Sequence, residues 1–198
     1  MIELLAITDD PAPVPPPLRV VAAAGLGLVV SAAAKDDVVD AEALWRREDL
    51  LEELMQGRTV LPVRYGTLVE DDTAAAEAIA GRAEALAAAL RRVRGAVELS
   101  VRVLIRGENG EGSPGEQLQA RAAGERAAVE IHARLSAAAR EHARHVGPEL
   151  LRAAYLVDSA QVDSFVALVR ALQNEHTELS AICTGPWLPY SFSEGEDA

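Results

Sequence analysis

The chain has 198 residues, of which 49% are hydrophobic, so it can form one domain or two small domains with packed cores. Its net charge of −12 argues against a nucleic-acid-binding protein, because phosphate binding requires a positive surface. The N-terminus lacks the pattern of a signal peptide, and the most apolar window, 18–34, is interrupted by Arg19, Gly25 and Gly27. Cys183 is the only cysteine, which excludes a disulfide within the chain. We therefore expect a cytoplasmic protein that does not span a membrane.

The first half of the sequence predicts the element order β-β-β-α-β-α. Apolar runs of strand length alternate with glycine and proline turns, and the acidic residues before the last helix are typical of an N-cap. The predicted elements are strands over 2–8, 18–23 and 26–31, a helix over 36–56, a strand over 59–64 and a helix over 71–91.

The second half predicts the order β-α-β-α-β. It opens with a strict alternation of apolar and mostly polar residues, which is typical of a half-buried strand, and a glycine-rich segment follows that could act as a hinge. The predicted elements are a strand over 96–105, the loop 107–115, a helix over 116–145, a strand over 151–157, a helix over 159–172 and a strand over 178–184.

Two of these helices carry apolar stripes at alternating steps of three and four residues. The stripe of the helix over 71–91 includes Leu86, and that of the helix over 116–145 includes Leu135. The matching stripes predict that these two helices pack antiparallel. Together the elements predict an α+β fold of two small domains, 1–95 and 96–198, each close to a ferredoxin-like topology.

A proline-aromatic segment, 185–192, follows the last predicted strand. It holds one Trp, one Tyr and one Phe in a chain with few aromatic residues, and its prolines stiffen the backbone. Such a segment can be fastened across its own domain or can form a partner site. We expect it to be anchored near the junction of the two halves and to help form a surface for a partner. The residues concerned are Pro186, Trp187, Pro189, Tyr190 and Phe192.

Arg64 follows the strand over 59–64 and precedes Tyr65, which makes both residues candidates for a site. A buried arginine requires a carboxylate partner. We favour a structural ion pair for Arg64 over a partner-binding role, and both interpretations stay open.

The sequence contains histidines and one cysteine, but their spacing does not predict a complete catalytic or metal site. His142 and His145 are predicted on one helix face near His132, but no third ligand converges on them, and His176 lies far along the chain. Cys183 falls in an apolar strand pattern, which favours a buried, inert thiol. We therefore expect no catalytic residue, no cofactor and no metal.

Five blocks of the sequence follow one another in order along the whole chain. The strongest are Leu61-Pro62-Val63-Arg64-Tyr65-Gly66-Thr67, Ala153-Ala154-Tyr155-Leu156-Val157-Asp158 with Phe165, and Thr184-Gly185-Pro186-Trp187-Leu188-Pro189-Tyr190-Ser191-Phe192. The weaker blocks are 97–103 and 113–118. Together these blocks resemble the gas vesicle protein F/L family. Two positions depart from the family pattern, namely Leu188, where a further proline is usual, and Gln117, where tyrosine is frequent.

The resemblance implies a modified ferredoxin-like N-terminal half and a second α+β half with long helices. It implies a non-catalytic accessory protein of gas vesicle assembly that binds the small hydrophobic shell protein, in a chaperone- or nucleation-like role, together with other gas vesicle accessory proteins. A ligand-sensing or catalytic pair of ferredoxin-like domains is the alternative, and it would require a pocket with converging polar groups.

Overall fold

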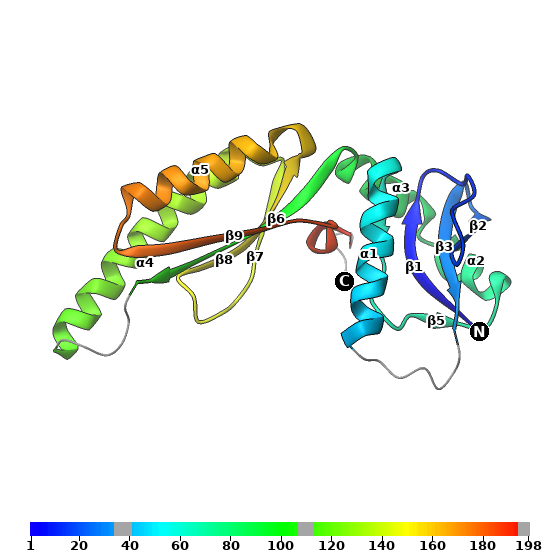
Figure 1. The fold of residues 1–198 in the computed structure, drawn as a ribbon, viewed down its shortest axis with the longest axis horizontal. Helices are drawn as coiled ribbons and strands as arrows, with labels where there is room; N and C mark the ends of the chain where they lie inside the picture. The colour runs from blue at the N-terminus through cyan, green and yellow to red at the C-terminus, as the bar shows by residue number, and fades with distance from the viewer. Residues whose placement is uncertain (34–40, 107–112, 194–198) are drawn as a thin grey trace. The chain divides into compact units, whose positions relative to one another are not determined.

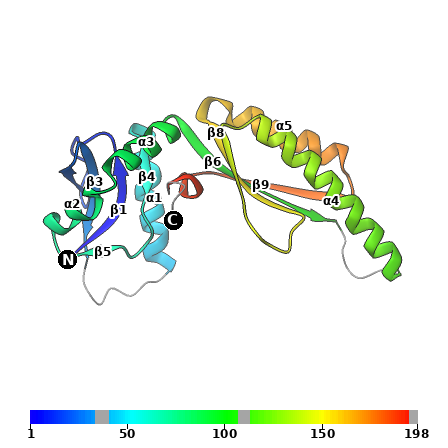
Figure 2. The same cartoon turned by 180° about the vertical axis from the view of Figure 1, so that it is seen from behind.

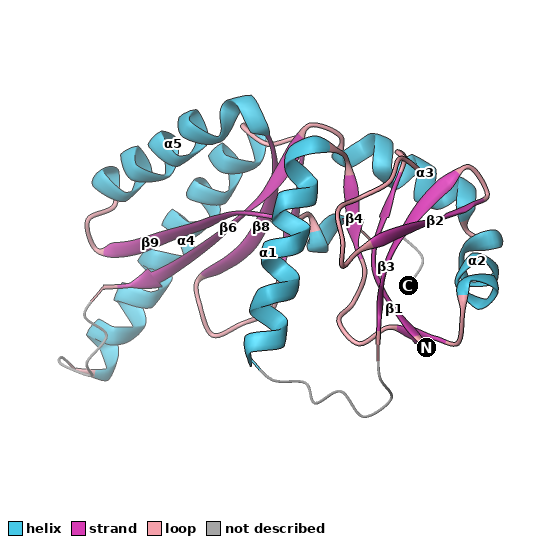
Figure 3. Cartoon of the chain, turned by 45° about the vertical axis from the view of Figure 1, so that its right-hand side comes forward, coloured by secondary structure: helices cyan, strands magenta, loops and turns pink. Residues whose placement is uncertain are grey.

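A computed structural model describes residues 1–33, 41–106 and 113–193 of the chain. It contains two compact units, Met1–Gly95 with Leu188–Ala198, and Ala96–Trp187, each with its own antiparallel sheet and helices (Figures 1 and 3). The predicted α+β fold of two small domains is confirmed. The start of the helix expected over 36–56 and most of the loop expected over 107–115 lie outside the described residues.

The first unit is built around a sheet with the strand order β2-β3-β1-β4, and β5 also pairs with β1. Six of the seven residues of β1 are buried, which explains why this strand is mostly apolar in the sequence. Its strands are β1 (Ile2–Thr8), β2 (Arg19–Ala23), β3 (Leu26–Ala32), β4 (Val60–Pro62) and β5 (Leu68–Val69).

Three helices pack against this sheet. Helix α1 (Ala41–Gly57) contacts β1 and β4, and its Leu51 and Leu54 enter the core of the unit. Helix α2 (Asp72–Ala80) contacts β2 and β5, and α3 (Ala83–Val93) contacts β4. The sequence predicted one helix over 71–91, whereas the structure has two, because the backbone leaves the helical path between them.

The second unit has the element order β-α-β-β-α-β and the sheet order β7-β8-β6-β9, which is the ferredoxin-like arrangement. In its core, the inward-facing side chains of the sheet pack against apolar side chains of both helices. The elements are β6 (Ala96–Ile105), α4 (Pro114–Ala137), β7 (Glu141–Arg144), β8 (Leu151–Asp158), α5 (Val162–Glu175) and β9 (Leu179–Trp187).

Helices α4 and α5 run side by side in opposite directions on one face of this sheet (Figures 1 and 2). The predicted helix over 116–145 is too long, because α4 ends at Ala137 and the residues up to Arg144 form β7, which pairs with β8. The predicted pairing of the stripes is also wrong. Leu86 is buried in the first unit, and Leu135 is buried in the second unit, where the helix partner of α4 is α5.

The tail continues from β9, which ends at Trp187, into a short 3₁₀ turn at Tyr190–Phe192. The expected domain 96–198 included this tail, whereas Leu188–Ala198 groups with the first unit. Leu188 is 1% exposed and belongs to the core of that unit, which is the reason for the difference. In the described part of the chain, no helix combines the length and the apolar character needed to cross a membrane.

Candidate functional site

The first unit contains a cleft of about 520 Å³ between α1, β4, the start of α3 and the tail. The cleft brings together three residues that the sequence singled out, Arg64, Tyr65 and Tyr190, although they come from distant parts of the chain. The lining residues are Ile7, Leu44, Arg47, Glu48, Leu61, Pro62, Val63, Arg64, Tyr65, Arg82, Leu86, Tyr190 and Ser193.

Arg47, on α1, is the buried cation of this cleft and is only 4% exposed. Its Nη2 donates to the carbonyl oxygens of Val63, at 2.5 Å, and Leu5, at 3.2 Å. Its Nε lies 3.5 Å from Oε1 of Glu3, and its guanidinium lies 5.4 Å from the centre of the Tyr65 ring. Arg47 therefore joins α1 to β1 and to the segment after β4, and it holds the Tyr65 ring at the cleft.

Tyr190 fixes the tail to α1. Its hydroxyl donates to Oε1 of Glu48 at 2.7 Å, and the hydroxyl oxygen of Tyr190 lies 3.5 Å from Nη1 of Arg47. Burial, followed by the hydrogen bond to Glu48, raises the pKa of Tyr190 far above its usual value, so the phenol stays protonated and remains a donor. Further along, Nη2 of Arg92 donates to the carbonyl oxygen of Phe192 at 2.6 Å.

The mouth of the cleft combines exposed cations with an exposed apolar side chain. Arg64 and Arg82 are both exposed, and neither has an ion pair within the described residues. Leu44 is 42% exposed on the same side of α1, while Leu61 and Leu86 are buried in the wall. A chain with a net charge of −12 therefore contains a local site with apolar, aromatic and positively charged groups.

The anchoring residues of the tail differ from those expected in one respect. Phe192 is 3% exposed, Pro189 is buried and Tyr190 is half-buried, so these residues are fastened to the first unit. Trp187 is 40% exposed at the end of β9, where its Nε1 donates to Oγ1 of Thr184 at 3.3 Å. The adjacent Leu188 takes the core position expected for this ring. Adjacent side chains of an extended chain point to opposite sides, so the ring of Trp187 points outward where Leu188 enters the core.

Pro186 is also exposed, so the first residues of the proline-aromatic segment are not packed into a core. The structural ion pair favoured for Arg64 is not present among the residues that the structure describes, because Arg64 is exposed and Arg47 is the buried arginine. Sequence reasoning missed Arg47. The signal was available, since Arg47 lies three residues after Leu44 and four before Leu51 and therefore falls within the apolar stripe of α1.

The histidine arrangement also differs from the prediction, because His142 lies on β7 and not on a helix with His145. The ring of His142 meets that of His132 on α4 at 4.8 Å between centroids. Nδ1 of His132 lies 2.8 Å from the hydroxyl of the buried Tyr155. Burial, and then the charges of His142 and Arg144, lower the pKa of His132, which favours the neutral form of this imidazole beside the phenol.

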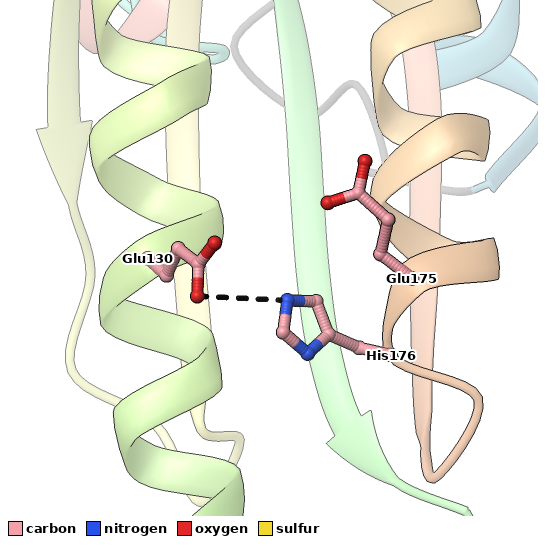
Figure 4. A group of neighbouring side chains, drawn as sticks. All are labelled: Glu130, Glu175 and His176. Carbon is pink, nitrogen blue, oxygen red and sulfur yellow. Dashed lines mark ion pairs between the residues drawn. The ribbon is translucent and has the colours of Figure 1, made fainter.

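A third group of titratable residues lies where α4 meets the end of α5 (Figure 4). Glu130, Glu175 and His176 each bring one possible ligand atom within 4.8 Å of the others. Both carboxylates are exposed, and Nη1 of Arg134 donates to Glu175 at 2.5 Å. Two carboxylates and an imidazole suit a divalent metal, but the arginine already neutralises one of the carboxylates, so the group is explained as surface ion pairs.

Cys183 lines a smaller hollow of about 370 Å³ beside α5. Burial raises the pKa of its thiol, which keeps the thiol protonated and weakens it as a nucleophile. The residues around it are Val166, Val169, Arg170, Gln173, Asn174 and Ala181, and they include no carboxylate and no histidine.

Comparison with known proteins connects this architecture to one family. The model of the family described as "Gas vesicle synthesis protein GvpL/GvpF" matches residues 13–114 and 111–194. Gas vesicle protein F of a Streptomyces species is 30% identical over 212 aligned positions, which cover 91% of this chain and 89% of that protein. Gas vesicle protein F1 of Halobacterium salinarum is 28% identical over 135 residues, which cover 68% of this chain but only 60% of that relative.

Two solved structures share the fold over nearly the whole chain. GvpF from Microcystis aeruginosa has a TM-score of 0.78 at 19% identity and covers 98% of this chain and 99% of its own. GvpF from Anabaena sp. PCC7120 has a TM-score of 0.82 at 17% identity, with 98% of both chains covered. On these matches the chain belongs to the GvpL/GvpF family of gas vesicle synthesis proteins.

Proposed function

We propose that this gas vesicle protein, whose family implies a role in gas vesicle assembly, binds the hydrophobic shell protein through the cleft of its first unit. In this proposal it acts in the cytoplasm as a non-catalytic accessory protein, alongside other gas vesicle accessory proteins. It keeps the shell subunit from aggregating until the subunit is added to the growing vesicle, or it starts that addition.

The observation that supports this role is the composition of the cleft. A hydrophobic client needs apolar and aromatic contact area, which Leu44, Tyr65 and Tyr190 supply. The remainder of the chain is acidic overall, and a strong net charge keeps a complex with an aggregation-prone client in solution. A contact site of this kind within an acidic protein suits a carrier of an insoluble subunit.

The candidate residues have separate roles in this proposal. Arg64, Tyr65 and Tyr190 contact the shell protein, while Pro189 and Phe192 hold the tail that forms one wall of the cleft. Trp187 and Pro186 are exposed on the second unit, and they offer an additional aromatic contact to a partner. Aromatic side chains that are rigid and exposed are frequent anchors in protein interfaces.

The test is co-purification of the shell protein with the tagged chain after the two are expressed together. The double variant Arg64→Ala/Tyr65→Ala should lose most of the co-purified shell protein, because it removes a cation and a ring from the cleft. The matched control is Arg126→Ala/Leu118→Ala, which removes an exposed arginine and an exposed apolar side chain from α4. Equal recovery of shell protein by the two double variants would contradict the proposal.

A further inference from the structure

The charged groups that line the cleft are not balanced within its wall. Arg47 is occupied by backbone carbonyl groups, Glu3 and the Tyr65 ring, and Glu48 accepts the hydrogen bond of Tyr190. The remaining charged lining residues are Arg64 and Arg82, which are exposed and have no acidic partner in the described part of the chain. Two guanidinium groups at the mouth are therefore available to a ligand.

These cations stand beside an apolar surface. Leu44 is 42% exposed at the cleft, and the side chains of Leu61, Pro62 and Leu86 continue this surface inward. A ligand that fills the cleft must therefore present an anionic group next to apolar side chains. A protein segment that carries one carboxylate among apolar residues has this chemistry.

We propose that the cleft recognises an Asp or Glu side chain within an otherwise apolar segment of the shell protein, and that Arg64 and Arg82 bind this carboxylate. The inference rests on the proposed function, because it specifies what the cleft selects in the same client. Arginine suits the task, since its planar guanidinium can donate two parallel hydrogen bonds to a carboxylate. The apolar neighbours of the carboxylate pack on Leu44 and the wall behind it.

The charge of the whole chain favours a single carboxylate over an extended polyanion. Nucleic acids and anionic membranes present many negative charges, which the net charge of −12 repels outside the cleft. Ionic screening limits the interaction of exposed charges to about 8 Å at physiological salt, so one carboxylate inside the cleft interacts mainly with the arginines beside it.

The experiment measures how much shell protein co-purifies with wild type, with Arg64→Gln/Arg82→Gln and with the control Arg126→Gln. Glutamine keeps the side chain polar, but it is shorter than arginine and removes both the charge and the guanidinium donors. The amount of shell protein recovered with the double variant should be about tenfold lower than with wild type, because charge-assisted hydrogen bonds are lost. The control should behave as wild type, and unchanged thermal unfolding of the double variant would show that the first unit is intact.

A charge exchange then tests the carboxylate itself. Each Asp and Glu of the shell protein is changed singly to Lys and expressed with Arg64→Glu/Arg82→Glu, and one of these exchanges should restore binding. If none does, the arginines do not bind a carboxylate and the inference is overturned. Residues 194–198 are acidic in sequence, and their removal tests whether a carboxylate of this chain, in place of the client, binds the arginines. If the arginine substitutions have no effect in that truncated chain, the tail and not the client supplies the carboxylate, and the inference is again overturned.

The outcomes also separate this inference from the proposed function. Failure of the wild type to bind the shell protein contradicts the proposed function. Binding that is equal for the wild type and for Arg64→Gln/Arg82→Gln leaves the proposed function standing and contradicts only the role of the arginines.

Discussion

The hydroxyl of Tyr190 donates to the carboxylate of Glu48 at 2.7 Å, and this contact joins the tail to α1 across 142 positions of the sequence. The hydroxyl oxygen of Tyr190 also lies 3.5 Å from Nη1 of Arg47, whose guanidinium contacts Glu3 and Tyr65. One polar network therefore determines the shape of the cleft, and the tail completes one of its walls. Changes to this network should affect both the stability of the first unit and its binding.

Removal of one oxygen atom tests the network. Tyr190→Phe should lower the free energy of unfolding by about 1–2 kcal/mol, because Glu48 then loses its half-buried donor. The control Tyr65→Phe should change little, because the Tyr65 hydroxyl has no hydrogen-bond partner among the described residues. Urea unfolding followed by circular dichroism measures both. A stability loss in Tyr65→Phe as large as that in Tyr190→Phe would contradict the assignment.

The anchor of the tail can be identified by comparing two adjacent residues. Leu188→Ala should cost about 2–5 kcal/mol of stability, because it leaves a cavity in the core of the first unit. Trp187→Ala should cost less than Leu188→Ala, although it removes the larger side chain, because the ring is 40% exposed and lies outside the core. Denaturant unfolding of both variants measures the difference, and the reverse order would show that Trp187 is the anchor.

Gly185 precedes the tail in a backbone conformation that side chains rarely adopt. Its φ is +120°, and an added Cβ would lie 2.8 Å from the carbonyl oxygen of Glu98. Gly185→Ala should therefore destabilise the protein by about 1–3 kcal/mol. Gly81→Ala is the matched control, since Gly81 has a φ of −75° and open space around its Cα. A melting temperature that falls equally in the two variants would argue against local strain at Gly185.

Acid should destabilise the second unit through His132. Its pKa in the folded state lies below the usual value of about 6.5, so the unfolded chain binds more protons between these two values. The free energy of unfolding therefore decreases as the pH falls through 6.5, and this decrease ends below the folded pKa. His142, Arg144, Ser136 and Tyr155 are the groups that face the imidazole.

The measurement is the free energy of unfolding of wild type and of His132→Gln at a series of pH values from 7.5 to 5. The wild type should lose more stability than the variant over this range, whereas His145→Gln, which replaces an exposed histidine, should follow the wild type. Parallel pH profiles for wild type and His132→Gln would show that His132 does not cause the effect.

The elements that depend on local sequence were predictable. The strand Ala96–Ile105 has the predicted bounds, because its alternation of apolar residues is the pattern of a sheet with one covered face. The N-cap at Asp71 is also confirmed, since its carboxylate accepts from the backbone N–H of Ala74 at 2.9 Å. In both cases the determining interactions lie within a few residues.

The errors concern interactions between distant residues. Glu141–Arg144 has no strong strand signal and becomes a strand only by pairing with β8. An alanine-rich stripe shows that a helix face is covered but does not identify what covers it, so Leu86 and Leu135 were paired wrongly. At the candidate site, Arg64, Tyr65 and Tyr190 were recognised, but the central role of Arg47 depends on contacts with β1 and the tail that the sequence does not display.

The central claim is that the shell protein binds in the cleft of the first unit, and site-specific photo-crosslinking tests it most directly. A photoreactive phenylalanine analogue is placed at Leu44, which is 42% exposed at the cleft, and in a control at Leu118, which is 70% exposed on α4. After co-expression and irradiation, the account predicts a covalent adduct with the shell protein from position 44 and none from position 118. An adduct from position 118 alone, or equal adducts from both positions, would contradict the account.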